Sequence, residues 1–357
     1  EFNGLAVHVS ESGVYDAYGS NFENTYVYSG GGADTASMLG TTGADKFYGL
    51  PTNSYIRAEG SAYLNYVKGF SNVTVDGAGG DDTAYLYDSD GDDSLTASPT
   101  TAEITFNPTA GGQIVNTLTA FSEINAIAEN GGNDDATLTG TNTVDKFYGF
   151  DDHSYLRADD WSYLFHTQGY DSVTSDALTG DDVAYFFDSD GDDMFTASLN
   201  ASTMTMNPVA GDPVAYAANN FGMTFAYAVT GNDSATLNGS AGEDRLYAKQ
   251  AYSYMRADDS SYFHYAKGFD TVTANALGTG DKAYLYDSDG NDALVSSSTS
   301  AAMTLNPTVG DPVVNTANDF GEVYAYSTSG GDDDATLNGS AGADRFHAYL
   351  SYAYLKA

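Results

Sequence analysis

The sequence predicts an all-β protein folded as a right-handed parallel β-helix, or β-solenoid. Three observations favour this fold: a repeat of about 100 residues, an excess of Asp over Glu, and period-two alternation of apolar and polar residues between turn signals. Asp is typical of turns and Glu of helices, so 41 Asp against 9 Glu argue against a helical protein. The 29 Tyr and 18 Phe also favour strands.

Two series of motifs recur along the chain at a nearly constant interval. The sequence DKFYG at 45–49 returns at 145–149, and related segments begin at Asp244 and Asp344, so the intervals are 100, 99 and 100 residues. Each unit has two related halves of about 50 residues, because an Asp-x-Ala step occurs seven times and a second Asp follows each step after eleven residues. These pairs are Asp34/Asp45, Asp82/Asp93, Asp134/Asp145, Asp182/Asp193, Asp233/Asp244, Asp281/Asp292 and Asp333/Asp344. The fixed offset indicates a geometric constraint.

The repeats define the domain organisation as one continuous solenoid over residues 1–357. It comprises a partial repeat 1–33, repeat units at about 34–133, 134–232 and 233–332, and a partial repeat 333–357. A tandem array of β-sandwiches is the alternative, since an immunoglobulin-like domain also has about 100 residues. A half-repeat of about 50 residues is too short for such a sandwich, and no Pro- or Ser-rich linker separates the units. The solenoid is therefore favoured.

Short strands are predicted in order within each half-repeat. The inward-facing residues of the second half-repeat are Ala84 and Leu86, then Leu95 and Ala97, then Ile104 and Phe106. Turn clusters at 79–81, 88–91 and 107–108 separate these strands. Four or five strands of about four to six residues per half-repeat correspond to roughly two coils, each stacked on the last.

Composition and charge exclude several classes of function. With 50 acidic and 12 basic residues the formal net charge is −38, so nucleic acid and anionic membranes are poor partners. No apolar run approaches the roughly 18 residues of a membrane span. The absence of Cys excludes disulfides, thiolate zinc sites and cysteine nucleophiles. An exported protein can also lack Cys, so composition leaves the compartment open.

Neither end of the sequence resembles a cap. The chain opens inside one half-repeat and closes inside another. Terminal coils of a solenoid present open strand edges that template association. We therefore expect either a window on a longer solenoid or a subunit whose ends are covered by neighbouring copies, so the expected partner is the protein itself.

The strongest local signal is an acidic loop that occurs three times, as DSDGDD at 88–93 and 188–193 and as DSDGND at 287–292. Carboxylates at alternate positions around a glycine that permits a tight turn can converge several oxygens on Ca²⁺. An acidic turn one strand earlier would flank the same ion. The predicted Ca²⁺ ligands are Asp82, Asp88, Asp90, Asp92, Asp93, Asp182, Asp188, Asp190, Asp192, Asp193, Asp281, Asp287, Asp289 and Asp292. A solvated turn without an ion is the alternative.

These loops resemble the RTX nonapeptide repeats of haemolysin-type proteins, which fold as calcium-bound parallel β-rolls. The resemblance rests on the segments 90–96, 190–196 and 289–295, with 241–247 and 341–347 as further matches. It covers about 20 residues in each 50, often without the double glycine, and the nonapeptides never run in tandem beyond two. It implies a large bacterial extracellular or surface repeat protein with RTX-like turns rather than an ordinary RTX roll.

Basic residues form a second series, with Arg57, Arg157, Arg256 and Lys356 at matching positions. Arg beside Asp or Ca²⁺ on a β-helix would suit a polysaccharide lyase. An enzyme needs one asymmetric site, however, whereas these residues recur with the repeat, and the five His lack a shared triad or ligand spacing. We expect each Arg to pair with a neighbouring acid such as Glu59 or Asp159, and we expect no enzymatic activity.

Tyrosine pairs also recur at the repeat spacing, including Tyr63 with Tyr66, Tyr262 with Tyr265 and Tyr324 with Tyr326. Like residues on successive coils stack as aromatic ladders; exposed tyrosines could instead bind glycans. The sequence therefore predicts a calcium-stabilised structural protein that assembles end-to-end or laterally into a filament or surface layer. An adhesin or carbohydrate-binding module is the second hypothesis, and a lyase-type β-helix enzyme the third.

Overall fold

The computed structural model describes residues 6–11, 15–20, 22–60, 62–348 and 353–356. The described residues form 36 β-strands and no helix. They build a parallel β-solenoid of about eight turns with two sheets, so the predicted all-β solenoid is confirmed. By its internal contacts the chain divides into two compact units, residues 1–182 with 214–219 and residues 183–213 with 220–357.

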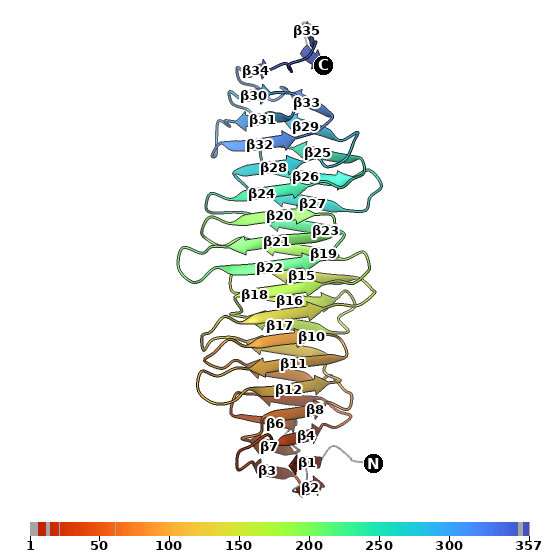
Figure 1. Ribbon diagram of the computed structural model, residues 1–357, viewed down its shortest axis with the longest axis vertical. Helices are drawn as coiled ribbons and strands as arrows, with labels where there is room; N and C mark the ends of the chain where they lie inside the picture. The colour runs from red at the N-terminus through yellow and green to blue at the C-terminus, as the bar shows by residue number, and fades with distance from the viewer. Residues whose placement is uncertain (1–5, 12–14, 21, 61, 349–352, 357) are drawn as a thin grey trace. The chain divides into compact units, whose positions relative to one another are not determined.

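The first unit consists of stacked strands that belong to two sheets, called A and B (Figure 1). Its strands are β1 (Ala6–Glu11), β2 (Tyr15–Ser20), β3 (Asn24–Tyr28), β4 (Thr35–Leu39), β5 (Asp45–Gly49), β6 (Asn53–Ala58), β7 (Leu64–Lys68), β8 (Asn72–Asp76), β9 (Thr83–Tyr87), β10 (Ser94–Ala97), β11 (Thr101–Phe106), β12 (Ile114–Thr119), β13 (Glu123–Ile127), β14 (Asp135–Thr139), β15 (Asp145–Gly149), β16 (His153–Ala158), β17 (Leu164–Gln168), β18 (Ser172–Asp176) and β22 (Val214–Asn219). Paired neighbours in sheet A follow the order β2-β1-β4-β8-β12-β11-β10-β14-β18-β22. Those in sheet B follow β3-β7-β6-β5-β9-β13-β17-β16-β15.

The second unit repeats this arrangement. Its strands are β19 (Val183–Phe187), β20 (Met194–Ser198), β21 (Ala201–Met206), β23 (Met223–Tyr227), β24 (Ser234–Asn238), β25 (Asp244–Ala248), β26 (Tyr252–Ala257), β27 (Phe263–Lys267), β28 (Thr271–Asn275), β29 (Lys282–Tyr286), β30 (Ala293–Ser296), β31 (Ser300–Leu305), β32 (Val313–Asn318), β33 (Glu322–Tyr326), β34 (Asp334–Leu337), β35 (Arg345–Ala348) and β36 (Ala353–Lys356). Sheet A follows β21-β20-β24-β28-β32-β31-β30-β34, and sheet B follows β19-β23-β27-β26-β25-β29-β33. Strands β35 and β36 form a separate antiparallel pair.

Each repeat adds strands by an alternating path that the sequence analysis did not foresee. The chain passes once through sheet A as β4, makes three antiparallel strands in sheet B as β5 to β7, and returns to sheet A as β8. It then passes once through sheet B as β9, makes three antiparallel strands in sheet A as β10 to β12, and returns to sheet B as β13. Three residues separate β5 from β6, too few for the crossover that a parallel pair requires. The two half-repeats therefore differ in which sheet holds the three-stranded meander.

The core lies between the sheets and follows the predicted alternation. All six residues predicted to face inward in the second half-repeat are buried: Ala84, Leu86, Leu95, Ala97, Ile104 and Phe106. Contacts reach across the interior between the two sheets, as where Asn116 Nδ2 of β12 donates to Ser54 Oγ of β6 at 3.1 Å. Strands of four to six residues are thus held by side-chain burial on one face and by backbone pairing at both edges.

One glycine shows how closely successive coils approach. Gly132 has φ of 119°, and a Cβ placed on it would lie 2.3 Å from the carbonyl oxygen of Gly91 in the acidic loop one half-repeat earlier. Any side chain at this position would therefore both strain the backbone and push two turns apart.

We predict that Gly132→Ala destabilises the first unit by about 1–3 kcal/mol, because of this strain and clash. Urea unfolding followed by circular dichroism measures the loss. Gly112→Ala is the matched control, since Gly112 has no atom within 4 Å of the added Cβ. Equal unfolding midpoints for the two variants would contradict the prediction.

Candidate functional site

The fourteen predicted calcium ligands lie at turns beside the strands. Asp82, Asp182 and Asp281 directly precede β9, β19 and β29, and the three acidic loops connect these strands to β10, β20 and β30. Every one of the fourteen carboxylates accepts a hydrogen bond from at least one backbone N–H. The carboxylates from which calcium binding was predicted therefore already accept hydrogen bonds from backbone amides.

The last Asp of each acidic loop closes that loop on itself. Asp93 Oδ1 accepts hydrogen bonds from Ser89 Oγ at 2.8 Å and from the backbone N–H of Asn107 at 2.6 Å, and Asp93 Oδ2 accepts one from the N–H of Ser89. Asp193 and Asp292 make the same set of contacts in the second unit. These three Asp are almost wholly buried. A buried carboxylate that satisfies several amides fixes the shape of the loop.

A second set of bonds joins consecutive half-repeats, and it accounts for the paired Asp seen in the sequence. The backbone N–H of the second Asp in one half-repeat donates to the carboxylate of the first Asp in the next, as from Asp93 to Asp134 Oδ1 at 2.7 Å. We call this contact the Asp junction. The other Asp junctions join Asp45 to Asp82 (2.7 Å), Asp145 to Asp182 (2.6 Å), Asp193 to Asp233 (2.8 Å), Asp244 to Asp281 (2.7 Å) and Asp292 to Asp333 (2.9 Å).

The remaining carboxylates of the acidic loops bind neighbouring turns. Asp88 Oδ2 accepts from the N–H of Asn130 at 2.6 Å, and Asp92 Oδ1 accepts from the N–H of Asn133 at 2.8 Å. Both donors lie one half-repeat further along the chain. Asp90 Oδ1 accepts from the N–H of Thr109 at 2.8 Å. These bonds recur at the equivalent loops of the second unit.

The hydrogen bonds of the acidic loops bear on how their carboxylates could meet a metal ion. Calcium requires six to eight oxygen ligands around one point. Within the described part of the chain no three acidic or His side chains come together to hold a metal ion. Each carboxylate of the acidic loops accepts a backbone amide, so calcium binding by these loops stays a prediction from the sequence.

Burial raises the pKa of the first Asp in five of the six Asp junctions. Burial raises the pKa of Asp134 and of Asp233 to about 7, against the opposing effect of the junction hydrogen bond. Burial likewise raises the pKa of Asp82 and of Asp182 to about 6. Nearby carboxylates add to the shift, chiefly Asp93 in the case of Asp134. Oδ2 of Asp82 and of Asp182 is buried without a hydrogen-bond partner, which fits an acid that carries a proton.

A buried tyrosine supports the Asp junction in one of the two half-repeats, and the sequence analysis missed it. Tyr163 donates its hydroxyl to Asp145 Oδ1 at 2.5 Å, and Tyr63 and Tyr262 occupy the equivalent buried positions. The signal was present, because a Tyr follows the second Asp after eighteen residues in all three repeats. The predicted pairs therefore divide: Tyr63 and Tyr262 lie in the core, whereas Tyr66 and Tyr265 lie on the outer face of sheet B.

One His also lies in the core. His264 is fully buried, its Nδ1 shares a hydrogen bond with Thr224 Oγ1 at 2.7 Å, and burial lowers its pKa to about 4. The equivalent neighbours in the first unit are the apolar pair Ile124 and Phe165. No regular spacing in the sequence indicates that this apolar pair of the first unit is replaced by a polar pair in the second unit.

The outer face of sheet B carries the predicted aromatic ladders. In the first unit Tyr48 stacks on Tyr55 and on Tyr85 with ring centroids 4.6 and 5.0 Å apart. In the second unit the chain of rings Tyr254, Tyr247, Tyr284 and Tyr324 has successive separations of 4.8, 4.8 and 5.2 Å. The interplanar angles are 10–17°, so the ring faces cover one another. Rings inside a ladder therefore cover each other's faces, whereas Tyr324 at the end of the second ladder is exposed.

The basic residues correct one sequence-based expectation. Arg57 donates to Tyr48 Oη at 3.3 Å and does not pair with Glu59, which is instead bound by Lys46 at 3.1 Å. Likewise, Lys146 Nζ forms an ion pair with Asp159 Oδ1 at 2.5 Å. The long Arg side chain lies over the tyrosine ladder because its guanidinium is attracted to the ring face.

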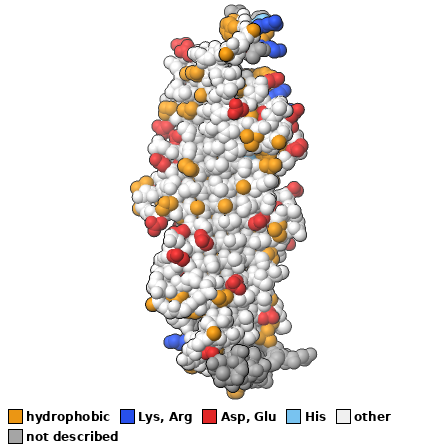
Figure 2. Space-filling model, in the orientation of Figure 1, with side chains coloured by type: hydrophobic (Ala, Val, Ile, Leu, Met, Phe, Trp, Pro, Cys, Tyr) orange, Lys and Arg blue, Asp and Glu red, His pale blue; other side chains and the backbone are white. Residues whose placement is uncertain are grey.

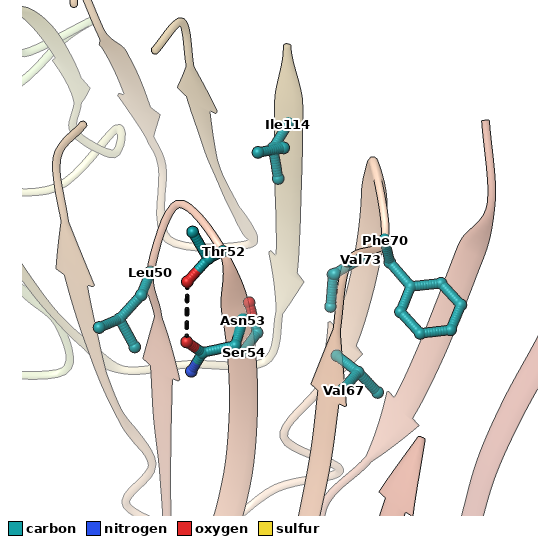
Figure 3. Close-up of a pocket in the computed structure, with 9 residues that line it drawn as sticks. Leu50, Thr52, Asn53, Ser54, Val67, Phe70, Val73 and Ile114 are labelled. Atoms are coloured by element: carbon teal, nitrogen blue, oxygen red, sulfur yellow. Dashed lines mark hydrogen bonds between the residues drawn. The ribbon is translucent and has the colours of Figure 1, made fainter. Parts of the chain in front are cut away.

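A small pocket opens beside the turn between β5 and β6 (Figure 3). Leu50, Ser54, Val67 and Phe70 are among its lining residues, and Thr52 Oγ1 donates to Asn53 Oδ1 at 3.1 Å at its rim. Its empty volume is about 160 Å³ with open solvent included, so it is a shallow hollow in the surface. Acidic side chains recur over the surface seen in Figure 2, whereas basic ones are few.

Comparison with known proteins gives no relative: no protein-family model matches the chain, and no curated protein matches it. In the described residues no helix has the length and apolarity needed to cross a membrane. The fold and the recurring Asp junctions define the class of this protein as a β-solenoid repeat protein.

We predict that Asp93→Ala lowers the free energy of unfolding by about 3 kcal/mol, because three donors lose their acceptor in a buried loop. Urea unfolding measures the change. Asp90→Ala is the matched control from the same loop, since the Asp90 side chain is exposed and its removal should have a much smaller effect. A larger effect at Asp90 than at Asp93 would refute the assignment.

We predict that thermal stability falls as pH rises from about 4 to 7. The folded pKa values of Asp82, Asp134, Asp182 and Asp233 exceed the ordinary value of 3.8, so the folded state binds protons more tightly across this window. Their stabilising contribution is complete below pH 4 and is lost as pH passes the folded pKa values. Burial also lowers the pKa of His166 and of His264, and both act in the opposite direction below their ordinary value of 6.5, but they are two groups against four.

Calorimetry at pH 5 and pH 8 should therefore give a Tm at least about 5 °C lower at pH 8. The double variant Asp134→Asn and Asp233→Asn keeps a hydrogen-bond acceptor but cannot ionise, so its Tm should depend less on pH. A wild-type Tm that is higher at pH 8 would show that the shifts have the wrong sign.

Proposed function

We propose that this chain is a structural segment of an extracellular repeat protein, and that its repeats build a stiff element of a filament or surface layer. The recurring Asp junction carries the proposal, because the same backbone-to-carboxylate bond ties each half-repeat to the next in both units. Contacts that repeat with the fold strengthen a polymer-like stack in proportion to its length.

The distribution of polar groups supports a mechanical role. The acids that a lyase could use accept hydrogen bonds from backbone amides, Arg57 lies against the ring of Tyr48, and Arg157 lies against the ring of Trp161. These arrangements recur from repeat to repeat, whereas catalysis requires groups gathered at one asymmetric site. A proposal without enzymatic activity accounts for the repetition directly.

The proposed partner is a further copy of the same solenoid, joined end-to-end or laterally. A net charge of −38 opposes close approach of two copies, so divalent cations would favour assembly by screening it. Calcium binding by the RTX-like loops stays a prediction from the sequence. Since those carboxylates already serve amides, calcium would have to bind through their remaining lone pairs or reorient them.

Electron microscopy with millimolar calcium, and again after chelation, tests assembly and calcium together. We expect fibres or sheets in calcium that separate on chelation. Magnesium at the same concentration is the control, since it screens charge equally but dehydrates less readily. Separate particles under every condition would overturn the proposal of a structural polymer, and assemblies unaffected by chelation would overturn the role of calcium.

A further inference from the structure

One turn of the first unit departs from the repeat in a way that the fold does not require. Trp161, the single Trp of the chain, lies in the turn between β16 and β17 with 64% of its surface exposed. Its φ is 61°, a left-handed conformation that is unfavourable for a bulky residue. The second unit has the same turn with Ser260 at φ of 65°, so the turn forms without an aromatic side chain.

The two turns have the same internal backbone hydrogen bond, so they differ in the side chain at this position and not in the fold of the turn. The N–H of Trp161 donates to the carbonyl of Ala158 at 3.2 Å, and the N–H of Ser260 donates to that of Ala257 at 3.2 Å. Trp161 therefore adds neither a backbone bond nor core packing. The strained backbone of this turn carries an exposed indole where the sister turn carries a Ser, which points to a role for the ring outside the folding of the turn.

Arg157 covers one face of the exposed indole, and further polar side chains belong to the same turn or to the strand β15 paired with β16. The Arg157 guanidinium lies 4.0 Å from the ring centroid and so covers one face, while its Nη1 donates to the carbonyl of Ala158 at 3.0 Å. Asp160 lies beside Trp161 in the turn, and its Oδ1 accepts the N–H of Ser162 at 3.0 Å. Lys146 and Asp159 form an ion pair at 2.5 Å nearby.

The charges at this turn cancel, although the chain as a whole is strongly acidic. Arg157 and Lys146 balance Asp159 and Asp160, whereas the chain carries −38. The acidic surroundings disfavour anionic ligands, and Arg157 already occupies the ring as its cation. A neutral ligand with an apolar face and hydroxyl groups suits what remains: an aromatic surface, guanidinium donors and a carboxylate acceptor.

We propose that Trp161, Arg157 and Asp160 form a contact site for a neutral polysaccharide whose sugars are equatorially linked pyranoses. The C–H groups on the flat face of such a sugar pack against the indole, and its hydroxyls bond to Arg157 and Asp160. This site occurs once, in the first unit, and it is independent of the assembly proposed above. It would attach a structural solenoid to a glycan matrix.

The single Trp makes the site directly observable, because indole emission reports Trp161 alone. Cellohexaose, xylohexaose and mannohexaose are the probes, with an oligogalacturonate as the anionic control. We expect at least one neutral probe to shift the emission to shorter wavelength with saturation at a Kd of about 0.1–10 mM. No saturable shift with any of the three, or tighter binding of the galacturonate, overturns the proposal.

Variants separate binding from folding. Trp161→Ser restores the residue type of the sister turn, so its Tm should equal or exceed that of the wild type while sugar binding, followed by saturation-transfer NMR, is lost. Arg157→Ala should weaken binding at least about fivefold, whereas Arg256→Ala, at the equivalent position without a Trp, should leave it unchanged. Binding that survives in Trp161→Ser assigns the sugar to another surface and overturns the site.

Discussion

The structure depends on one interaction, the hydrogen bond between an Asp carboxylate and a backbone N–H one half-repeat away. A solenoid stacks short strands, and each turn between them leaves amide groups without partners inside the sheet ladders. The buried carboxylates of Asp93, Asp193 and Asp292 satisfy these amides inside a loop, and the Asp junctions satisfy those between loops. Asp is suited to both tasks because its short side chain accepts several hydrogen bonds without reaching far from the backbone.

This solution places many acids close together with few basic residues to offset them. The consequence is visible at Asp134 and Asp233, where burial and a neighbouring carboxylate raise the pKa to about 7, so that near neutral pH a bound proton offsets part of the missing counter-charge. Tyr163 donates its hydroxyl to Asp145, whose backbone N–H forms the next Asp junction with Asp182. Acidity in this protein is therefore partly structural, in that the same carboxylates that charge the chain also join its half-repeats.

Features that recur in both units and a feature that occurs once point to different roles in this molecule. The stacked tyrosines on sheet B recur in both units, and the ring faces inside each stack cover one another. They therefore pack against the outer surface of the sheet as part of the repeat. Trp161 occurs once, is exposed, and occupies a turn that Ser260 serves equally well. A feature that breaks an otherwise regular pattern at an energetic cost is the better guide to a binding role.

The sequence by itself determined the all-β solenoid, its repeat and the inward residues such as Ala84, Leu86 and Ile104, because strand period and turn composition are local properties. It also marked the paired Asp through their fixed offset, but it could not say what they bind. Only the tertiary structure decided that, since the amide donor to Asp134 lies 41 residues away at Asp93. The three-stranded meanders and the exchange of Ile124 and Phe165 for Thr224 and His264 were likewise decided by which strands meet, which local spacing does not encode.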